Sequence, residues 1–248
     1  MKRIILPFLM FCGLSCGAQV LNIESARFVT DTDGWVGHLG FSFVMVQNTK
    51  QVISFGNDAQ LQYRKHRSRY LFVSNVALER AGGQDFVNTG FQHLRYNYYV
   101  NDWLTWEALA QVQYNKVLKM DSRFVVGTGP RFTLFFRDRY RMHLGVIYIH
   151  EDEKVTGETM EYHDHRISTY LSFSWNIGKN TELVSTTFYQ PNVKELPDYR
   201  IATNNFLEID IHKHLAFRTG FDLLYDTKQP RGIPNLTYTY RNSLDWKF

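Results

Sequence analysis

One-by-one alternation of apolar and polar residues recurs along most of the chain and constrains its fold more than any other feature. In the stretch WLTWEALAQVQYNKV, Leu104, Trp106 and Ala108 fall on one face of an extended strand, and Thr105 and Glu107 fall on the other. A helix would mix Glu107 with the apolar residues, because its period is about 3.6 residues rather than 2. No segment keeps a helical period over several turns, so the sequence predicts an all-β protein.

The same criterion, applied along the chain, predicts about twelve strands. Their approximate spans are 34–47, 51–64, 69–79, 89–100, 103–117, 122–136, 141–151, 165–176, 181–190, 199–211, 215–226 and 235–248. Alternation is poorest in 69–79, 141–151 and 181–190, where the register is least well defined.

The predicted connections alternate between long and short. The long ones are RAGGQDFVN, KVLKMD, EDEKVTGETMEYHD, PNVKELPD and TKQPRGIPN, and the short ones are KHRS, ND, RDRY, IGKN and HKH; only the first connection, NTK, departs from the rule. Outer-membrane barrels sort their connections in this way, with long loops outside the cell and tight turns in the periplasm. An even number of strands also leaves both chain ends on the periplasmic side.

These features favour a transmembrane antiparallel up-and-down β-barrel over residues 34–248. A sheet crosses hydrocarbon only when it is closed, because every backbone N–H and C=O must be paired there. Aromatic residues near strand ends suit the interfacial girdles of such barrels: Trp35, Trp103, Trp106, Tyr225 and Trp246. The mean hydropathy of −0.33 fits too, because half of each strand faces a polar lumen. A soluble lipocalin-like barrel is the alternative, but it would bury far too many charges.

The amino terminus has the pattern of a secretory signal peptide over residues 1–18. Lys2 and Arg3 precede an apolar run over 4–14, and small residues follow up to Ala18. The run is too short for a transmembrane anchor, which needs about 20 apolar residues. Lipidation of Cys16 is a further alternative, although Leu14 stands one place too close for the usual lipoprotein pattern. Residues 19–33 are then a periplasmic segment, and the protein is expected in the outer membrane of a Gram-negative bacterium.

Both cysteines, Cys12 and Cys16, fall inside the predicted signal peptide. The mature chain would therefore have neither a disulfide framework nor thiolate chemistry. Cleavage also removes Lys2 and Arg3, which lowers the net charge from +4 to +2, with 26 basic against 24 acidic residues. A nearly neutral chain does not support a nucleic-acid partner.

Several segments resemble a family of bacterial outer-membrane proteins described as salt-induced and catalogued as domain of unknown function 481. The resemblance covers about 34–248 and is most specific in HLRYNY (93–98), YQP (189–191), DYR (198–200) and Tyr225, Asp226 and Pro230. It implies a barrel without an agreed activity, so no catalytic residue is carried over. The terminal Phe248 also resembles the C-terminal signal that barrel-assembly machinery reads.

The polar face of the predicted barrel is heavily charged. The candidate lumen-lining residues are Asp58, Arg64, His93, Arg95, Glu107, Arg123, Arg131, Arg166, Arg200, Glu208, Asp210, Arg218, Asp222, Arg241 and Asp245. Adjacent strands lie about 4.8 Å apart, so oppositely charged residues on neighbouring strands can meet. Two interpretations follow: a network of ion pairs that stiffens the barrel, or a selective pore lined by charged ladders.

A membrane-embedded lipid hydrolase with a Ser–His site is the alternative from another functional class. His38, Ser42, His143, His163, His165 and Ser168 are present. However, the sequence has no G-x-S-x-G motif and no distinctive Ser-plus-His spacing, so no catalytic residue is assigned. His163, Asp164 and His165 also have a spacing that metal ligands use on a strand. A solvated loop explains them more simply, and neither a metal nor a cofactor is expected.

The expected role is therefore a structural, osmotic-stress-related protein of the envelope or a narrow passive channel for small solutes. The expected partners are outer-membrane lipids and, during biogenesis, periplasmic chaperones and the barrel-assembly machinery, while the oligomeric state is left open. The last strand carries the expected assembly signal, Tyr240, Leu244, Trp246 and Phe248. It should pair with 35–47, because that seam would remove both free edges of the sheet.

Overall fold

The computed structural model describes residues 33–137, 139–157 and 161–246. The predicted signal peptide over 1–18, most of the segment 19–33 and the terminal Phe248 lie outside these residues. No described residue belongs to a helix long and apolar enough to cross a membrane.

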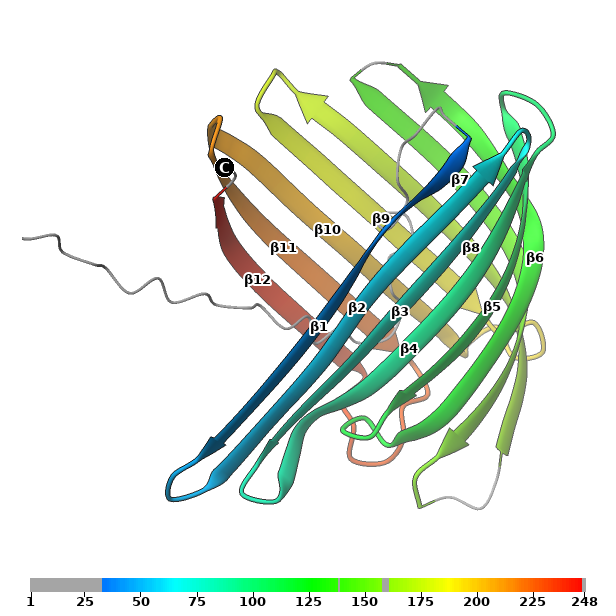
Figure 1. Cartoon of the computed structure of the whole chain (residues 1–248). Helices are drawn as coiled ribbons and strands as arrows, with labels where there is room; N and C mark the ends of the chain where they lie inside the picture. The colour runs from blue at the N-terminus through cyan, green and yellow to red at the C-terminus, as the bar shows by residue number, and fades with distance from the viewer. Residues whose placement is uncertain (1–32, 138, 158–160, 247–248) are drawn as a thin grey trace, which may run out of the picture.

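The described residues form one antiparallel sheet in which each strand pairs with the next along the chain (Figure 1). The strands are β1 (Gly34–Gln47), β2 (Gln51–Lys65), β3 (Ser68–Ala81), β4 (Gln84–Tyr99), β5 (Leu104–Asn115), β6 (Met120–Phe136), β7 (Tyr140–Val155), β8 (Glu161–Ile177), β9 (Thr181–Pro191), β10 (Tyr199–His212), β11 (Leu215–Asp226) and β12 (Leu236–Trp246). The predicted all-β, up-and-down, twelve-stranded architecture is confirmed, and the sheet curves around an interior as a barrel wall does (Figure 1).

The outer face of the sheet is apolar and the inner face is polar. Residues directly opposite each other on paired strands share a face. Phe221 lies opposite Tyr240, and Leu223 lies opposite Tyr238; Tyr238 is 68% exposed. Charged side chains such as Glu107 and Arg166 are instead almost fully buried. This distribution inverts that of a soluble domain, and it matches a sheet whose outer surface meets hydrocarbon.

Two rows of aromatic side chains mark opposite ends of the outer face. At the short-turn end, Trp35, Tyr63, Tyr70 and Tyr96 form a continuous row with ring centroids 4.7, 6.3 and 5.0 Å apart. At the long-loop end, Tyr199 lies between Tyr189 and Tyr225, at 5.8 and 6.0 Å. Amphipathic rings at two levels are the arrangement expected at the two interfaces of a bilayer.

The apolar band on β11 has the height of a hydrocarbon core. It begins at Leu215 and ends at Tyr225. Ten residue steps of about 3.3 Å, tilted by about 40°, rise about 25 Å, which is the height of the lipid-facing band in outer-membrane barrels.

Two of the predicted long loops are mostly strand, which corrects the loop pattern read from the sequence. β3 and β4 continue to a tight turn at Gly82 and Gly83, whose φ angles of +58° and +83° are readily adopted only by glycine. Likewise β7 continues to Val155, and β8 starts at Glu161. The sequence rule failed here because it relies on an apolar outer face, which a strand loses once it rises beyond the lipid.

The β7–β8 hairpin shows this transition. On the outer face of β7, Tyr148 is followed by His150, Asp152 and Lys154. Lys154 pairs with Glu161 at 2.6 Å, and both side chains are exposed. The hairpin therefore extends past the apolar band as paired strands with polar residues outside.

Strands β1 and β12 are the two edges of the sheet, and no ladder joins them among the described residues. The seam predicted between the last strand and 35–47 is therefore not formed in this structure. The outer faces of both edges are strongly exposed, with Phe41 at 74% and Leu244 at 67%. The predicted assembly residues Tyr240, Leu244 and Trp246 lie on the outer face of β12.

Candidate functional site

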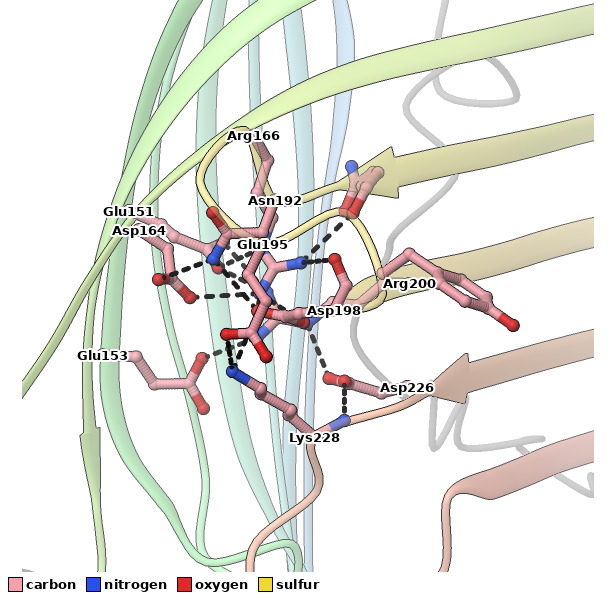
Figure 2. A network of polar contacts seen from close by, with 12 residues as sticks. Glu151, Glu153, Asp164, Arg166, Asn192, Glu195, Asp198, Arg200, Asp226 and Lys228 are labelled. Atoms are coloured by element: carbon pink, nitrogen blue, oxygen red, sulfur yellow. Dashed lines mark hydrogen bonds and ion pairs between the residues drawn. The ribbon is translucent and has the colours of Figure 1, made fainter.

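The interior of the sheet contains two clusters of charged residues, and the larger surrounds Glu151. Glu151 on β7 is only 1% exposed and accepts hydrogen bonds from guanidinium groups on three other strands. Arg123 Nε lies 3.1 Å from Oε2. Arg166 Nε lies 2.8 Å from Oε1, and Arg200 Nη1 lies 2.7 Å from Oε1 (Figure 2). We call the set Arg123, Glu151, Glu153, Arg166, Asp198, Arg200 and Asp226 the Glu151 cluster.

The remaining carboxylates of the Glu151 cluster complete the pairing of its guanidinium groups. Arg166 Nη2 donates to both oxygens of Asp198 at 3.0 and 2.8 Å. Arg200 donates to Asp226 at 2.6 Å and to Glu153 at 3.2 Å. Burying a guanidinium is tolerable only with such partners, because an unpaired charge away from water is very costly. The cluster therefore ties β6, β7, β8, β10 and β11 together across the interior.

Loops from the long-loop end close over this cluster. Asn192, just after β9, donates from Nδ2 to Asp164 at 2.9 Å and to Asp198 at 3.0 Å. Lys228, just after β11, donates to Glu195 at 2.5 Å, and this hydrogen bond raises the pKa of Lys228 above its ordinary value. These contacts hold the loop 192–198 against the loop 227–235.

The loop 227–235 also reaches the loop between β5 and β6. Lys119 Nζ donates to the backbone carbonyl of Arg231 at 2.7 Å. These two loops follow strands that are far apart in the sheet order, so this bond links distant parts of the wall at the long-loop end (Figure 1). We call the loop 227–235 with these contacts the loop cover.

An apolar layer separates the Glu151 cluster from the second cluster. Along the inner face of β7, Gly145, Ile147, Ile149 and Glu151 follow one another. Ile147 and Ile149 pack with other buried inner residues, namely Val125, Tyr170, Phe188, Ala202 and Leu224. This layer contains no charged side chain and lies between the two charged clusters.

The second cluster surrounds Glu107, which is fully buried on β5. Asn97 Nδ2 donates to Glu107 Oε1 at 2.5 Å, and Tyr170 Oη donates to Oε2 at 2.6 Å. Arg95 Nη1 and Arg131 Nη1 approach the same carboxylate at 3.5 and 3.8 Å. We call these five residues the Glu107 cluster.

Tyr170 connects the Glu107 cluster with the apolar layer. Its ring packs against Phe188 at 5.4 Å between centroids, and its hydroxyl accepts a hydrogen bond from Arg131 at 3.1 Å. The ring covers Gly145, where an added Cβ would lie only 2.1 Å from Tyr170 Cε1. The absence of a side chain at Gly145 therefore leaves room for the ring to reach Glu107.

Beyond the Glu107 cluster, a cavity of about 910 Å³ opens at the short-turn end. Its wall includes residues of the β2–β3 and β4–β5 connections, so it forms the mouth of the barrel at that end, and Arg131 lies at its inner limit. We call it the vestibule. The charged side chains that line it are Arg64, Arg67, Arg69, Asp102, Arg131, Arg141 and Glu182, and His66 and His143 also contribute to its wall.

Other predicted lumen residues lie outside these clusters. Asp58 bonds to His38, and Asp222 bonds to Arg241 and Asn204. Glu208 and Asp210 line a small cavity of about 150 Å³ near the β8–β9 turn.

Arg218 and Asp245 complete the predicted set. Arg218 lies opposite Glu208 in the β10–β11 register, and its guanidinium carbon lies 4.1 Å from the centroid of the Phe206 ring. The side chain of Asp245 is outside the described part of the chain.

The structure brings Arg123, Arg166 and Arg200 together, as it does Arg95, Glu107 and Arg131, while His93 contacts Arg95 at 3.3 Å. The candidate lumen-lining residues chosen from the sequence did not include the acidic partners Glu151, Glu153, Asp198 and Asp226, or Tyr170. Glu151 and Glu153 follow Ile147 and Ile149 at every second position of β7 and so face the interior as well. Extending the predicted strand beyond residue 151 would have identified both as inward-facing residues.

The segments that carry the family resemblance supply much of both clusters. HLRYNY contributes Arg95 and Asn97, and DYR contributes Asp198 and Arg200. The pair Tyr225 and Asp226 places one residue in the outer aromatic row and one in the Glu151 cluster. The most specific pieces of the sequence are thus those that form the barrel interior and one aromatic row.

A family model described as "Protein of unknown function, DUF481" matches residues 39–248. This chain belongs to the DUF481 family. The family assignment inferred from the sequence is therefore confirmed, and it covers most of the described DUF481 sheet. No curated protein matches the chain.

Among solved structures, the DUF481 chain is similar to a NanC porin, with a TM-score of 0.49 and 10% identity over 87% of this chain and 99% of that one. A KdgM porin has a TM-score of 0.43 and 10% identity, over 84% of this chain and 98% of that one. A bacterial polysaccharide outer membrane secretin has a TM-score of 0.45 and 11% identity, over 87% and 86%.

Among the described residues, no group of three or more His, Cys, Asp or Glu side chains is arranged to hold a metal ion. His163 and His165, expected in a loop, lie instead on β8. His163 Nδ1 bonds to Asp152 at 2.5 Å, and His165 Nδ1 bonds to Tyr148 Oη at 2.6 Å.

Proposed function

We propose that this DUF481 protein is an integral outer-membrane β-barrel that acts as a narrow passive channel for small solutes. The observation that carries the proposal is the vestibule, a cavity of about 910 Å³ with many polar side chains in its wall, inside a sheet whose outer face is apolar. A water-accessible polar interior behind a lipid-compatible wall is the arrangement through which barrels conduct.

The membrane location rests on the outer face. Its apolar band, about 25 Å high, and its two aromatic rows fit a bilayer. Export through a cleaved signal peptide over 1–18 and residence in a Gram-negative outer membrane are part of the same proposal. Outer-membrane lipids are its proposed partners, with barrel-assembly machinery and periplasmic chaperones acting during biogenesis.

The proposed channel is narrow because its interior is crowded. A solute that enters the vestibule next meets the Glu107 cluster, the apolar layer and the Glu151 cluster in turn. Long inward side chains leave little open space in a small barrel. We therefore expect small or brief conductance steps rather than the steady large steps of a wide pore.

The test is the conductance of refolded protein in a planar lipid bilayer. Folding of the protein in detergent is checked separately. A folded barrel should migrate differently in a gel before and after heating, and its circular dichroism spectrum should be that of a β-protein. Discrete steps above the bare bilayer support the channel. Correctly folded and inserted protein without steps would contradict it, and protein that stays monodisperse without detergent would contradict the membrane location.

A structural role in the envelope under osmotic stress is the second candidate. Its support is the same dense interior, since ion pairs that link five strands stiffen a wall without opening a path. Loss of the gene would then sensitise cells to osmotic shock, and a non-conducting but folded variant would restore resistance.

The lipid hydrolase alternative gains no support from the interior. Ser168 accepts a hydrogen bond from Gln190 at 2.9 Å, and Ser42 lies 3.5 Å from the Gly56 carbonyl. His38 bonds to Asp58, on the wall near the open edge of the sheet. These contacts do not include the serine–histidine hydrogen bond on which nucleophile activation depends.

A further inference from the structure

We infer that the vestibule is a binding site for multivalent organic anions, whose acidic groups are carboxylates or phosphates. That such anions pass through the channel rests on the proposed function. That they bind in the vestibule rests on the residues that line it.

The vestibule is lined mainly by cationic side chains. Five arginines line it, Arg64, Arg67, Arg69, Arg131 and Arg141, against two carboxylates, Asp102 and Glu182. Two further carboxylates approach these arginines: Asp33 lies 4.0 Å from Arg64 Nε, and Glu107 lies 3.8 Å from Arg131 Nη1. Five arginines therefore face four carboxylates, which leaves a positive excess. In the Glu151 cluster, by contrast, three arginines face four carboxylates.

Two of these arginines are also held in place around the cavity. The Arg69 guanidinium lies 5.3 Å from the centroid of the Tyr99 ring, and Arg131 bonds to Tyr170. A planar guanidinium presents a fork of N–H donors that matches the two oxygens of a carboxylate or phosphate. Held guanidinium groups lose less conformational entropy when an anion binds, so they favour binding over mobile surface lysines.

The position of the cavity strengthens the effect of this charge. Its wall is a protein sheet surrounded by an apolar face, and a low-dielectric wall focuses the electric field into the opening. An excess of positive charge at a narrow mouth therefore concentrates anions and repels cations.

The size and lining of the cavity point to an organic anion rather than a single inorganic ion. A volume of about 910 Å³ lies in the range of pockets that bind small organic ligands, about 300–1,000 Å³. Val184 and Phe206 contribute apolar surface to the wall, and Thr105 and Ser172 contribute hydroxyl groups. Carbon-bearing molecules with two or more acidic groups fit this mixture, because the arginines take the charges and the apolar side chains take the skeleton.

The direct test is isothermal titration calorimetry of the refolded full chain in neutral detergent. The probes are citrate and fructose 1,6-bisphosphate, which separate carboxylate from phosphate recognition, and sucrose as an uncharged probe. We expect one or both anions to bind and sucrose not to bind. Folded wild-type protein that binds neither anion would overturn the inference, whether or not it conducts.

The matched variants locate the binding. The triple variant Arg64→Gln, Arg67→Gln, Arg69→Gln should weaken anion binding by about tenfold or more, since charge-assisted bonds to guanidinium groups are lost. Arg80→Gln is the control, because Arg80 pairs with Asp85 at 2.5 Å near the opposite end of β3. An equal loss in the control would overturn the vestibule as the site. Should the triple variant fail to fold, Arg67→Gln replaces it, since Arg67 is exposed in the β2–β3 turn and has no packing role.

Reversal potentials in a KCl gradient connect binding with transport. The wild-type channel should prefer chloride over potassium, and the vestibule variant should lose most of that preference. Conductance with a cation preference would overturn the inference while leaving the channel intact. Anion binding without any conductance would overturn the proposed channel while leaving the binding site standing.

Discussion

Glu151 occupies a position where a single carboxylate accepts hydrogen bonds from guanidinium groups on three other strands. Arg123, Arg166 and Arg200 all donate to it, and it is 1% exposed. The favourable energy of such a site is small in net terms, because desolvation offsets much of the attraction. Its removal is costly, because the guanidinium groups stay buried after their partner is gone.

Replacement of Glu151 by glutamine should therefore destabilise the folded protein by about 3–5 kcal/mol. The amide keeps the size of the side chain but removes the charge that three arginines share. Denaturant unfolding in detergent, followed by tryptophan fluorescence, measures the change.

Glu161→Gln serves as the control for this change. Glu161 pairs with Lys154 at 2.6 Å, but both side chains are exposed, so the loss should stay below about 1 kcal/mol. Equal effects of the two substitutions would contradict the importance assigned to the Glu151 cluster.

Gly145 is a second position where a single residue matters, because its lack of a side chain leaves room for the Tyr170 ring. Alanine there would place its Cβ 2.1 Å from the Tyr170 ring. The ring must move, which weakens its hydrogen bond to Glu107, and overpacking of this kind costs about 1–3 kcal/mol. Thermal unfolding of Gly145→Ala measures the loss.

Gly220→Ala is the matched control, because the nearest atom to its added Cβ lies at 3.6 Å, an ordinary contact distance. A Gly145→Ala protein as stable as Gly220→Ala would show that the Tyr170 ring has room to move.

Part of the interior could be predicted from the sequence, residue by residue. His93, Arg95 and Glu107 alternate strictly with apolar residues, which predicts that their side chains face the interior. Arg95 and Glu107 lie on neighbouring predicted strands, so contact between them could also be expected. The pairing of Asp198 with Arg166 could not be predicted from the sequence. Asp198 lies in the loop 192–198, and an alternating pattern predicts strands but not the path of a loop.

At the scale of elements, the loop cover is the feature that joins separate connections. Lys119 fastens 227–235 to the β5–β6 loop, and Lys228 fastens it to Glu195. These exposed contacts are individually weak. A loop held by a few weak contacts opens more readily than the strands it connects.

The double variant Lys119→Gln, Lys228→Gln should loosen this cover and raise the mean conductance, or the frequency of open events, in planar bilayers. Lys50→Gln is the control, because Lys50 lies in the β1–β2 connection at the same end without a contact to the cover. Unchanged conductance of the double variant would mean that the cover does not limit passage.

Strand ends were predicted most closely where the outer face is apolar along the whole strand. The bounds of β1 and β11 agree with the alternation residue for residue. The β7–β8 hairpin was cut short because His150, Asp152 and Lys154 follow Tyr148 on the outer face. Alternation reports the solvent on each face of the sheet, and it disappears when both faces meet water.

At the scale of the whole molecule, the open edge between β1 and β12 matters most. Each unpaired backbone group in hydrocarbon costs several kcal/mol, so a membrane-embedded sheet of this kind favours closure. We therefore predict that β1 and β12 pair in a bilayer, although their edges are separate in this structure.

Hydrogen–deuterium exchange in liposomes tests this closure. The β1 amides that point away from β2 should exchange as slowly as those bonded to β2. Amides of the exposed loop cover provide a fast reference. Rapid exchange of the outer β1 amides in folded, inserted protein would contradict the seam.

The β7–β8 hairpin has a consequence for molecules that approach this end of the protein. Because its strands stay paired past the lipid-facing band as far as Lys154 and Glu161, this part of the hairpin has a defined shape. If the long-loop end faces the cell exterior, as the proposed membrane location implies, an antibody or a bacteriophage receptor-binding protein would meet His163 and Glu161 on a preformed β-surface, which lowers the entropy lost on recognition. Gly157, where an added side chain would meet open space, is then a suitable place to graft a peptide for display.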